Sequence, residues 1–192
     1  IALADHVSPD FPALWEEMTR TSFKTYRSYL GLPGDPVEWI DRYVVADDDT
    51  GRRPARPDAL PFADYEDLIA DLTPNRQMLP KGSTPFGNRF VSRNETLMFN
   101  IADYGHTLMT DFLLAGGRIE HREFHAPNEF SRLKEKVVIN CTGYGARDLW
   151  KDNSVVPVRG QSQWLIPQPE VKYGLLYNGI YVLSRREVIY VR

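Results

Sequence analysis

The chain has 192 residues, of which 42% are hydrophobic and 26% are charged, and its formal net charge is −3. This length allows one domain or two small ones, and the nearly balanced charge gives no electrostatic reason to expect nucleic acid or a membrane as a partner. An aromatic content of 12% argues against disorder, and no apolar run reaches the ~20 residues of a transmembrane helix.

The cysteine count and the chain ends give two further indications. A single cysteine, Cys141, excludes an internal disulfide and a cysteine-rich zinc site. It also favours a reducing, cytoplasmic compartment, although the location is otherwise unknown. The sequence begins at Ile1 and stops at Arg192, directly after the β-like run 188–191. We therefore expect it to be part of a longer sequence.

The first hundred residues are predicted to contain helices and strands in alternation. Apolar side chains recur at helical spacing over residues 9–30, and Gly31 suits a left-handed stop for that helix. We expect a strand over residues 39–45, a short helix over 63–72, and one or two strands over 89–98.

The middle of the chain has the pattern of a nucleotide-binding α/β sheet. A second helix is expected over residues 101–115, with Asn100 as its N-cap. Residues 118–124 are predicted to form a strand, and the β-branched run 137–141 a buried one, with a crossover between them. A glycine-containing turn at 142–145 follows, as in sheets that bind nucleotides.

The pattern changes again after Pro157. Strand-like runs follow at residues 163–166, 179–183 and 187–191, and they are joined by turns rather than by crossovers. We therefore expect a second, β-rich subdomain to begin near Pro157.

The sequence carries no complete catalytic or metal motif. Asp148 stands where a Gly-x-Gly-x-x-Gly fingerprint has its third glycine, which favours a tight turn over a pyrophosphate site. Cys141 is interpreted as a small hydrophobe rather than a nucleophile. The three aspartates at 47–49 are interpreted as an exposed turn because an EF-hand pattern is absent. His121 and His125 would stand about 13 Å apart on a strand, too far to share one ion, so no metal site is predicted.

Three linked motifs give the chain a family resemblance. They are Val-Val-Ile-Asn-Cys-Thr-Gly at residues 137–143, Ala-Arg-Asp-Leu at 146–149 and Val-Pro-Val-Arg-Gly-Gln at 156–161. In this order and spacing they resemble the D-amino-acid oxidase family of FAD-dependent oxidoreductases. The likeness covers roughly residues 100–192, and the preceding part agrees only in broad outline.

The resemblance implies FAD as the cofactor and assigns site residues by position. Four residues fall where the family's chain meets the adenine or lines the FAD: Phe124, Cys141, Thr142 and Gly143. Tyr177 and Tyr181 match the family's Tyr-Asn-x-x-Tyr active-site segment, in which Tyr177 would lie on a mobile lid and Tyr181 would donate its hydroxyl to the substrate carboxylate. Read from the residues alone, two tyrosines beside a hairpin are more often packing residues.

The implied reaction is the oxidative deamination of a D-amino acid. Hydride passes from the substrate α-carbon to the flavin, dioxygen reoxidises the flavin to give H2O2, and the imino acid hydrolyses in water. The implied partners are a small amino-acid or amine substrate and dioxygen, and a homodimer is a candidate assembly. Because the flavin supplies the redox chemistry, the task left to the protein is to orient the substrate.

The expected fold class is α/β (α+β mixed), with part of a Rossmann-like FAD-binding domain interleaved with a β-rich substrate-binding domain. Residues 1–98 are assigned to the substrate or cap domain, 99–156 to the FAD-binding domain, and 157–192 to a second substrate-domain segment. The family's Gly-x-Gly-x-x-Gly unit and its C-terminal carboxylate-binding arginine are absent from this sequence. We therefore expect an internal fragment that alone neither binds FAD tightly nor turns over.

Two alternatives stay open. The first is a glycine- or sarcosine-type amine oxidase, or a dehydrogenase, of the same superfamily, which peroxide release across a panel of amines would distinguish. The second is a non-catalytic α/β binding module in which residues 140–143 form only a turn. A Gly-x-Gly-x-x-Gly strand–turn–helix in the flanking sequence would exclude it.

Overall fold

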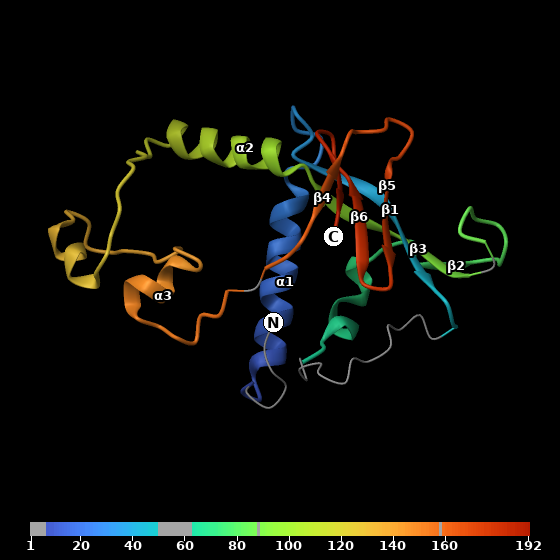
Figure 1. Cartoon of the computed structure of the whole chain (residues 1–192), viewed down its shortest axis with the longest axis horizontal. Coiled ribbons are helices and arrows are strands. Elements are labelled where there is room, and N and C mark those ends of the chain that lie inside the picture. The colour runs from blue at the N-terminus through green and yellow to red at the C-terminus, as the bar shows by residue number, and fades with distance from the viewer. Residues whose placement is uncertain (1–6, 50–62, 88, 158) are drawn as a thin grey trace. The chain divides into compact units, whose positions relative to one another are not determined.

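The computed structural model describes residues 7–49, 63–87, 89–157 and 159–192 (Figure 1). The chain divides into two compact units. The first unit combines residues 1–111 with 162–192, and the second consists of residues 112–161. The domain boundaries expected from the sequence remain a prediction, and the two units are described separately below.

The first unit is built on a seven-stranded sheet with the order β2-β3-β1-β5-β6-β7-β4. Its strands are β1 (Val37–Ala46), β2 (Gln77–Leu79), β3 (Phe90–Phe99), β4 (Gln163–Leu165), β5 (Tyr173–Tyr177), β6 (Ile180–Ser184) and β7 (Ile189–Val191). All neighbouring strands are antiparallel except β1 and β5, which are parallel. This one parallel pairing joins the early and late segments of the chain into a single sheet.

Two helical elements of the first unit precede most of the sheet in sequence. Helix α1 (Phe11–Arg27) contacts the sheet through aromatic rings, with Tyr26 4.9 Å from Phe99 between ring centroids. The 3₁₀ helix η2 (Glu66–Leu72) is tied to α1 because Arg20 donates to the Asp71 carboxylate at 2.8 Å. Both elements confirm the helices expected near these positions, although η2 is a 3₁₀ helix.

The core of the first unit lies along the β1–β3 pair. Val37 is opposite Phe99 and Val45 is opposite Val91, and Val37, Val45 and Val91 are all buried. The two strands pair over their full ten-residue lengths. The buried residues of β1 include Val37, Ile40, Val45 and Ala46, which lie on both faces of the sheet.

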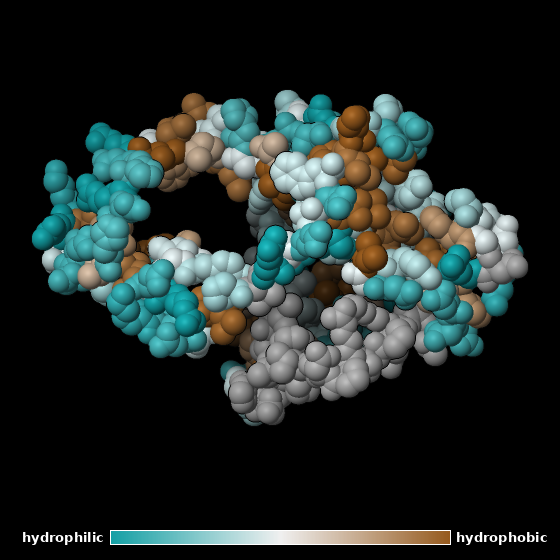
Figure 2. Space-filling view, in the orientation of Figure 1, coloured by the Kyte–Doolittle hydropathy of each residue, from teal (hydrophilic) through white to brown (hydrophobic). Residues whose placement is uncertain are grey.

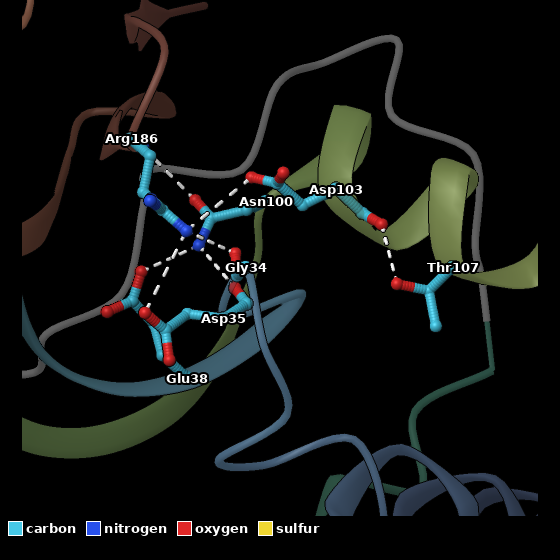
Figure 3. Close-up of polar contacts among 7 residues, drawn as sticks. All are labelled: Gly34, Asp35, Glu38, Asn100, Asp103, Thr107 and Arg186. Carbon is cyan, nitrogen blue, oxygen red and sulfur yellow. Dashed lines mark hydrogen bonds and ion pairs between the residues drawn. The ribbon is translucent and has the colours of Figure 1, made fainter.

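One buried amide connects three segments of the first unit (Figure 3). The Asn100 side chain is 0% exposed, and its Nδ2 donates to the carbonyl of Asp35 at 2.7 Å and to Oε1 of Glu38 at 2.8 Å. Its Oδ1 accepts from the backbone N–H of Arg186 at 3.1 Å. The Arg186 guanidinium in turn donates to the carbonyl of Gly34. The start of β1, the start of the next helix and the β6–β7 turn are therefore held together.

Helix α2 (Ile101–Leu114) begins where it was expected, but Asn100, the residue before it, makes different hydrogen bonds from the predicted ones. The Asn100 side chain was expected to cap the helix. Its oxygen and nitrogen bond instead to Arg186, Asp35 and Glu38, which are distant in the sequence. The amide oxygen is the side chain's acceptor for a capping bond, and it accepts instead from the backbone N–H of Arg186.

The second unit contains short helices and no strand among its described residues. Its helical elements are η3 (Pro127–Arg132) and α3 (Gly145–Trp150). The strands expected at 118–124 and 137–141 are wrong, because the structure forms no strand in either segment. The side chains of Val137 and Ile139 are 80% and 83% exposed. A strand that is apolar on both faces forms inside a sheet, between neighbouring strands. The described residues of this unit supply no such neighbours.

The mixed α/β class is thus confirmed, with a mostly antiparallel sheet. The strand-like runs after residue 157 are confirmed as β4, β6 and β7. Strand β5 was not expected from the sequence. In the part of the chain that the structure describes, no helix is long and apolar enough to cross a membrane.

We predict that Asn100→Ala lowers the free energy of unfolding by about 2–3 kcal/mol, because buried partners lose their hydrogen bonds. Urea unfolding followed by circular dichroism measures the change. Asn128→Ala, the same substitution at an exposed position, serves as the control and is expected to cost less than about 0.5 kcal/mol. Equal losses in the two variants would contradict the role given to Asn100.

Candidate functional site

The β5–β6 hairpin carries both tyrosines that were predicted to contact substrate. Its two-residue turn, Asn178–Gly179, has φ values of 48° and 78°, as in the turns that join tightly paired strands. The register places Tyr177 opposite Ile180 and Leu176 opposite Tyr181. Opposed residues share a face and successive residues alternate, so Tyr177 and Tyr181 lie on opposite faces of the sheet.

Tyr177 belongs to a polar cluster at the end of β1. Its hydroxyl donates to the Asp47 carboxylate, at 3.0 Å from Oδ1 and 3.2 Å from Oδ2. Asn178 Nδ2 lies 3.4 Å from the same carboxylate, and Arg89 Nε donates to it at 3.2 Å. The Arg89 guanidinium also stacks on Tyr177, 5.2 Å from the ring centroid. We call these four side chains the Asp47 cluster.

Hydrogen bonding stabilises the charged forms of Asp47 and Arg89 in the Asp47 cluster. The hydroxyl of Tyr177 and, secondarily, the amide of Asn178 lower the pKa of Asp47 below its ordinary value of 3.8. The hydrogen bonds to Tyr177 and Asp47 raise the pKa of Arg89. At neutral pH the cluster therefore contains one carboxylate and one guanidinium, and these two charges cancel.

A cavity of about 460 Å³ adjoins the Asp47 cluster. Its lining residues are Val45, Pro85, Phe86, Gly87, Arg89, Leu175 and Tyr177. Most of these side chains are apolar, and the two polar ones belong to the Asp47 cluster. The volume lies in the range of small-molecule sites, which combine apolar walls with a few placed polar groups.

The other face of the hairpin presents Tyr181 beside β7. The backbones of Tyr181 and Arg192 exchange hydrogen bonds of 2.7 and 2.9 Å, and the ring of Tyr181 lies 5.9 Å from that of Tyr190. Hydrogen bonding with Ser162 lowers the pKa of Tyr190, and hydrogen bonding with Tyr181 raises that of Arg192. This face thus combines phenol hydroxyls with a cation, groups that can donate to a carboxylate.

The second unit has a cavity of its own, of about 530 Å³. Its lining residues are Arg118, Glu120, Arg122, Phe124, Arg132, Leu133, Lys134, Glu135, Val137 and Val138. Four basic side chains outnumber two acidic ones, and an aromatic ring completes the wall. The Phe124 ring packs against Phe130 at 4.9 Å between centroids, so it is held in place from within this unit.

The loop at residues 140–143 is locally ordered and open. Asn140 Oδ1 accepts from the backbone N–H of Thr142 at 3.3 Å and from its hydroxyl at 2.8 Å. Gly143 has φ +55°, and a Cβ at this position would meet nothing within 4 Å. The Cys141 thiol is exposed. A positive φ favours glycine, and the open surroundings leave the backbone accessible to a ligand.

The predicted site residues thus fall into four places. Phe124 lines the cavity of the second unit, whereas Cys141, Thr142 and Gly143 lie in the open loop of the same unit and are absent from that lining. Tyr177 and Tyr181 occupy opposite faces of the first unit's sheet. Their assigned roles remain predictions. Among the described residues, no group of three or more metal-ligating side chains gathers.

Sequence reasoning missed two members of the Asp47 cluster. Asp47 was interpreted as part of an exposed turn, and Arg89 was not considered as a site residue. Asp47 and Tyr177 are 130 positions apart in the chain. No local pattern signals such a contact, because it depends on the parallel pairing of β1 with β5.

No protein-family model matches the chain. A D-amino-acid oxidase of Streptomyces coelicolor is 49% identical over 49 residues, which is 26% of this chain and 14% of that protein. A D-amino-acid oxidase of Dictyostelium discoideum is 40% identical over 58 residues, which is 30% of this chain and 16% of that protein. The chain resembles D-amino-acid oxidases. The matched part spans about a seventh of the length of each relative, so the resemblance is confirmed over a short segment.

We predict that Tyr177→Phe raises the pKa of Asp47 toward its ordinary value, because the variant removes the main hydrogen-bond donor to the carboxylate. In the native protein the ionised form of Asp47 contributes stability above pH 3.8, and this contribution is lost as pH falls through the lowered pKa. The part of this stabilisation that comes from the Tyr177 hydroxyl should be lost in the variant. NMR titration of the Asp47 carboxyl carbon measures the shift.

The matched control is Tyr181→Phe, which removes the same hydroxyl on the opposite face of the hairpin. It should leave the pKa of Asp47 unchanged. An equal shift in both variants, or none in Tyr177→Phe, would show that the hydroxyl does not set the ionisation of this carboxyl.

Proposed function

We propose that this chain forms part of an FAD-dependent oxidoreductase of the D-amino-acid oxidase type, which oxidatively deaminates a D-amino acid. The observation that carries the proposal is the match to two D-amino-acid oxidases. The motif Asn-Cys-Thr-Gly at residues 140–143, followed by Arg-Gly-Gln at 159–161, adds support because these linked motifs also led to the same family from the sequence.

The second unit offers groups that suit FAD. A dinucleotide carries two phosphates and an aromatic base, and the cavity of this unit has guanidinium and ammonium groups around the Phe124 ring. Arginine forks bind phosphate oxygens. The open loop at 140–143 presents an accessible backbone at Gly143. Under the proposal, Phe124 meets the adenine and residues 141–143 line the cofactor, while the basic side chains hold phosphate.

Uncovered apolar side chains support a larger FAD-binding domain of the Rossmann-like kind. The run at residues 137–139 is exposed, although its β-branched composition is that of a buried parallel strand. Helix α2 also exposes large apolar side chains: Leu108, Met109, Phe112, Leu113 and Leu114. Patches of this kind mark interaction surfaces. We propose that further strands of the whole protein pair with residues 137–141.

The first unit is proposed to supply the substrate side of the enzyme. Its sheet exposes apolar side chains, among them Trp164, Leu165 and Ile180, and hydrophobic surface extends over its strands in Figure 2. The Tyr181 hydroxyl, beside Tyr190 and Arg192, would donate to the substrate carboxylate. The lid role of Tyr177 is compatible with this only if the hairpin changes its pairing, since the two tyrosines lie on opposite faces.

In this reaction FAD would take up the hydride from the substrate α-carbon and pass the electrons on to dioxygen, giving H2O2. The protein's residues would bind and orient the amino acid. Phenol hydroxyls and a guanidinium can hold a carboxylate in a fixed orientation. A fixed orientation raises the reaction rate because the reacting atoms are already in position. The imino acid then hydrolyses in water. Dioxygen and a D-amino acid are the proposed partners, with a homodimer as a candidate assembly.

We predict that Tyr181→Phe in the whole protein raises the KM for D-amino acids about tenfold, because one hydrogen bond to a charged group is lost. Peroxide release is measured with the D-amino acid that reacts best in a panel, with its L-enantiomer as the blank. Tyr29→Phe is the matched control, because Tyr29 lies after helix α1 and packs against Tyr104, 5.3 Å between ring centroids. An unchanged KM would contradict the role of Tyr181, and no peroxide from any D-amino acid would contradict the proposed function.

A further inference from the structure

Arg186 ties the turn between β6 and β7 to the rest of the first unit (Figure 3). Its backbone N–H donates to the amide oxygen of the buried Asn100 at 3.1 Å, and its guanidinium donates to the carbonyl of Gly34. The same guanidinium lies 3.8 Å from a carboxylate oxygen of Asp35 and 3.9 Å from one of Asp103. The main chain and the side chain of this turn residue are therefore both bonded to segments that are 86 and 152 positions away.

This tie restrains the strand that follows the turn. Strand β6 pairs with β5 over four positions, and the Ser184 hydroxyl at its end donates to the carbonyl of Val171. Strand β7 pairs over only three positions with β6 and three with β4. Val188 and Ile189 are buried, but the burial of apolar surface is non-directional. The hydrogen bonds of Arg186 supply a directional restraint just before β7 begins.

The turn also places two side chains near Tyr181. The Tyr190 ring on β7 lies 5.9 Å from the ring of Tyr181 between centroids. The guanidinium of Arg185, the neighbour of Arg186 in the turn, stacks 5.2 Å from the centroid of Tyr190. Nε of Arg185 is buried and has no hydrogen-bond partner among the described residues. Since no hydrogen bond at this atom fixes the side chain, the place of Arg185 over Tyr190 depends on the backbone of the turn.

The energetics of Arg186 favour a role in positioning over a role in stability. The side chains of Arg186, Asp35 and Asp103 are 51%, 60% and 40% exposed, and ion pairs this open to water contribute little to stability. The backbone bond to Asn100 does not involve the side chain of Arg186. A small displacement of a group that orients a substrate can nevertheless lower the reaction rate strongly.

We propose that Arg186 is a positioning residue for the face of the sheet that carries Tyr181. It holds the β6–β7 turn so that Tyr190, stacked with Arg185, packs beside Tyr181 and keeps the Tyr181 hydroxyl directed at the substrate carboxylate. Arg186 acts through Tyr181 and not by contact with the substrate. The proposal rests on the proposed function in the contact between Tyr181 and the substrate, whereas the arrangement of these side chains requires neither flavin nor substrate.

Titration of the tyrosines in the 192-residue chain, followed by NMR, tests the arrangement. Hydrogen bonding with Ser162 lowers the pKa of Tyr190 below its ordinary value of 10.0. In Arg186→Gln the turn loses its side-chain bonds, so we expect the pKa of Tyr190 to rise toward 10.0. Arg93→Gln removes another exposed ion pair, with Asp41 at 2.8 Å, and should leave it unchanged. No rise in Arg186→Gln, or an equal rise in both variants, would overturn the proposal.

A second variant covers the case in which Arg186→Gln fails to fold, as judged by circular dichroism. Asp103→Asn keeps the guanidinium and its bond to Gly34, and it removes one of the two carboxylates near it. The pKa of Tyr190 should then rise by less than a complete loss of the tie would give. An unchanged titration of Tyr190 in this variant would count against the proposal.

A double-mutant cycle in the whole protein tests whether the effect passes through Tyr181. Arg186→Gln should raise the KM for the best D-amino acid, but by less than Tyr181→Phe, because the hydroxyl is misdirected and not removed. Added to Tyr181→Phe, it should raise the KM no further. Effects that multiply in the double variant would overturn the proposal. If no D-amino acid gives peroxide, the proposed function fails, and the titration alone decides whether Arg186 places Tyr190 beside Tyr181.

Discussion

The arrangement of the first unit depends on the buried amide of Asn100. This single side chain bonds to Asp35, Glu38 and Arg186, which come from segments 62 to 86 positions away. Burial makes each of these bonds obligatory, because an unsatisfied donor or acceptor without water is costly. The amide therefore fixes where β1 begins and where the β6–β7 turn lies. Since β7 carries Tyr190 beside Tyr181, and Arg192 directly follows β7, the same constraint shapes that face of the sheet.

A second constraint separates the two faces of this sheet. The two-residue turn at Asn178–Gly179 sets the register of β5 and β6, and the period of two then places Tyr177 and Tyr181 apart. Tyr177 lines an apolar cavity and donates to Asp47, which is paired with Arg89. Tyr181 lies beside Tyr190 and Arg192 on the other face. The family resemblance assigns Tyr177 and Tyr181 to one site, whereas in the structure they lie on two chemically different surfaces.

Sequence patterns predicted the helices, strands and turns that are determined by neighbouring residues in the chain. The first helix, the strand at β1 and the turn at Asn178–Gly179 follow from spacing and turn chemistry, and the structure contains them. The helix ends at Arg27, with Ser28 as its C-cap, and not at the expected stop, Gly31. The strand expected at 137–141 failed because a parallel strand depends on neighbours that no local pattern supplies. The Asp47 cluster escaped prediction for the related reason that Asp47 meets Tyr177 only through the β1–β5 pairing. Asn100 was predicted to cap helix α2, but its side chain is buried and bonds to residues distant in the sequence.

We propose that this chain is part of a flavin enzyme that acts on D-amino acids. It is tested most directly by adding a D-amino acid, without oxygen, to the whole protein and following the flavin absorbance. The account predicts that the flavin colour is lost with the D-enantiomer, persists with the L-enantiomer, and returns when air is admitted. A whole protein whose flavin is not bleached by any D-amino acid would contradict it.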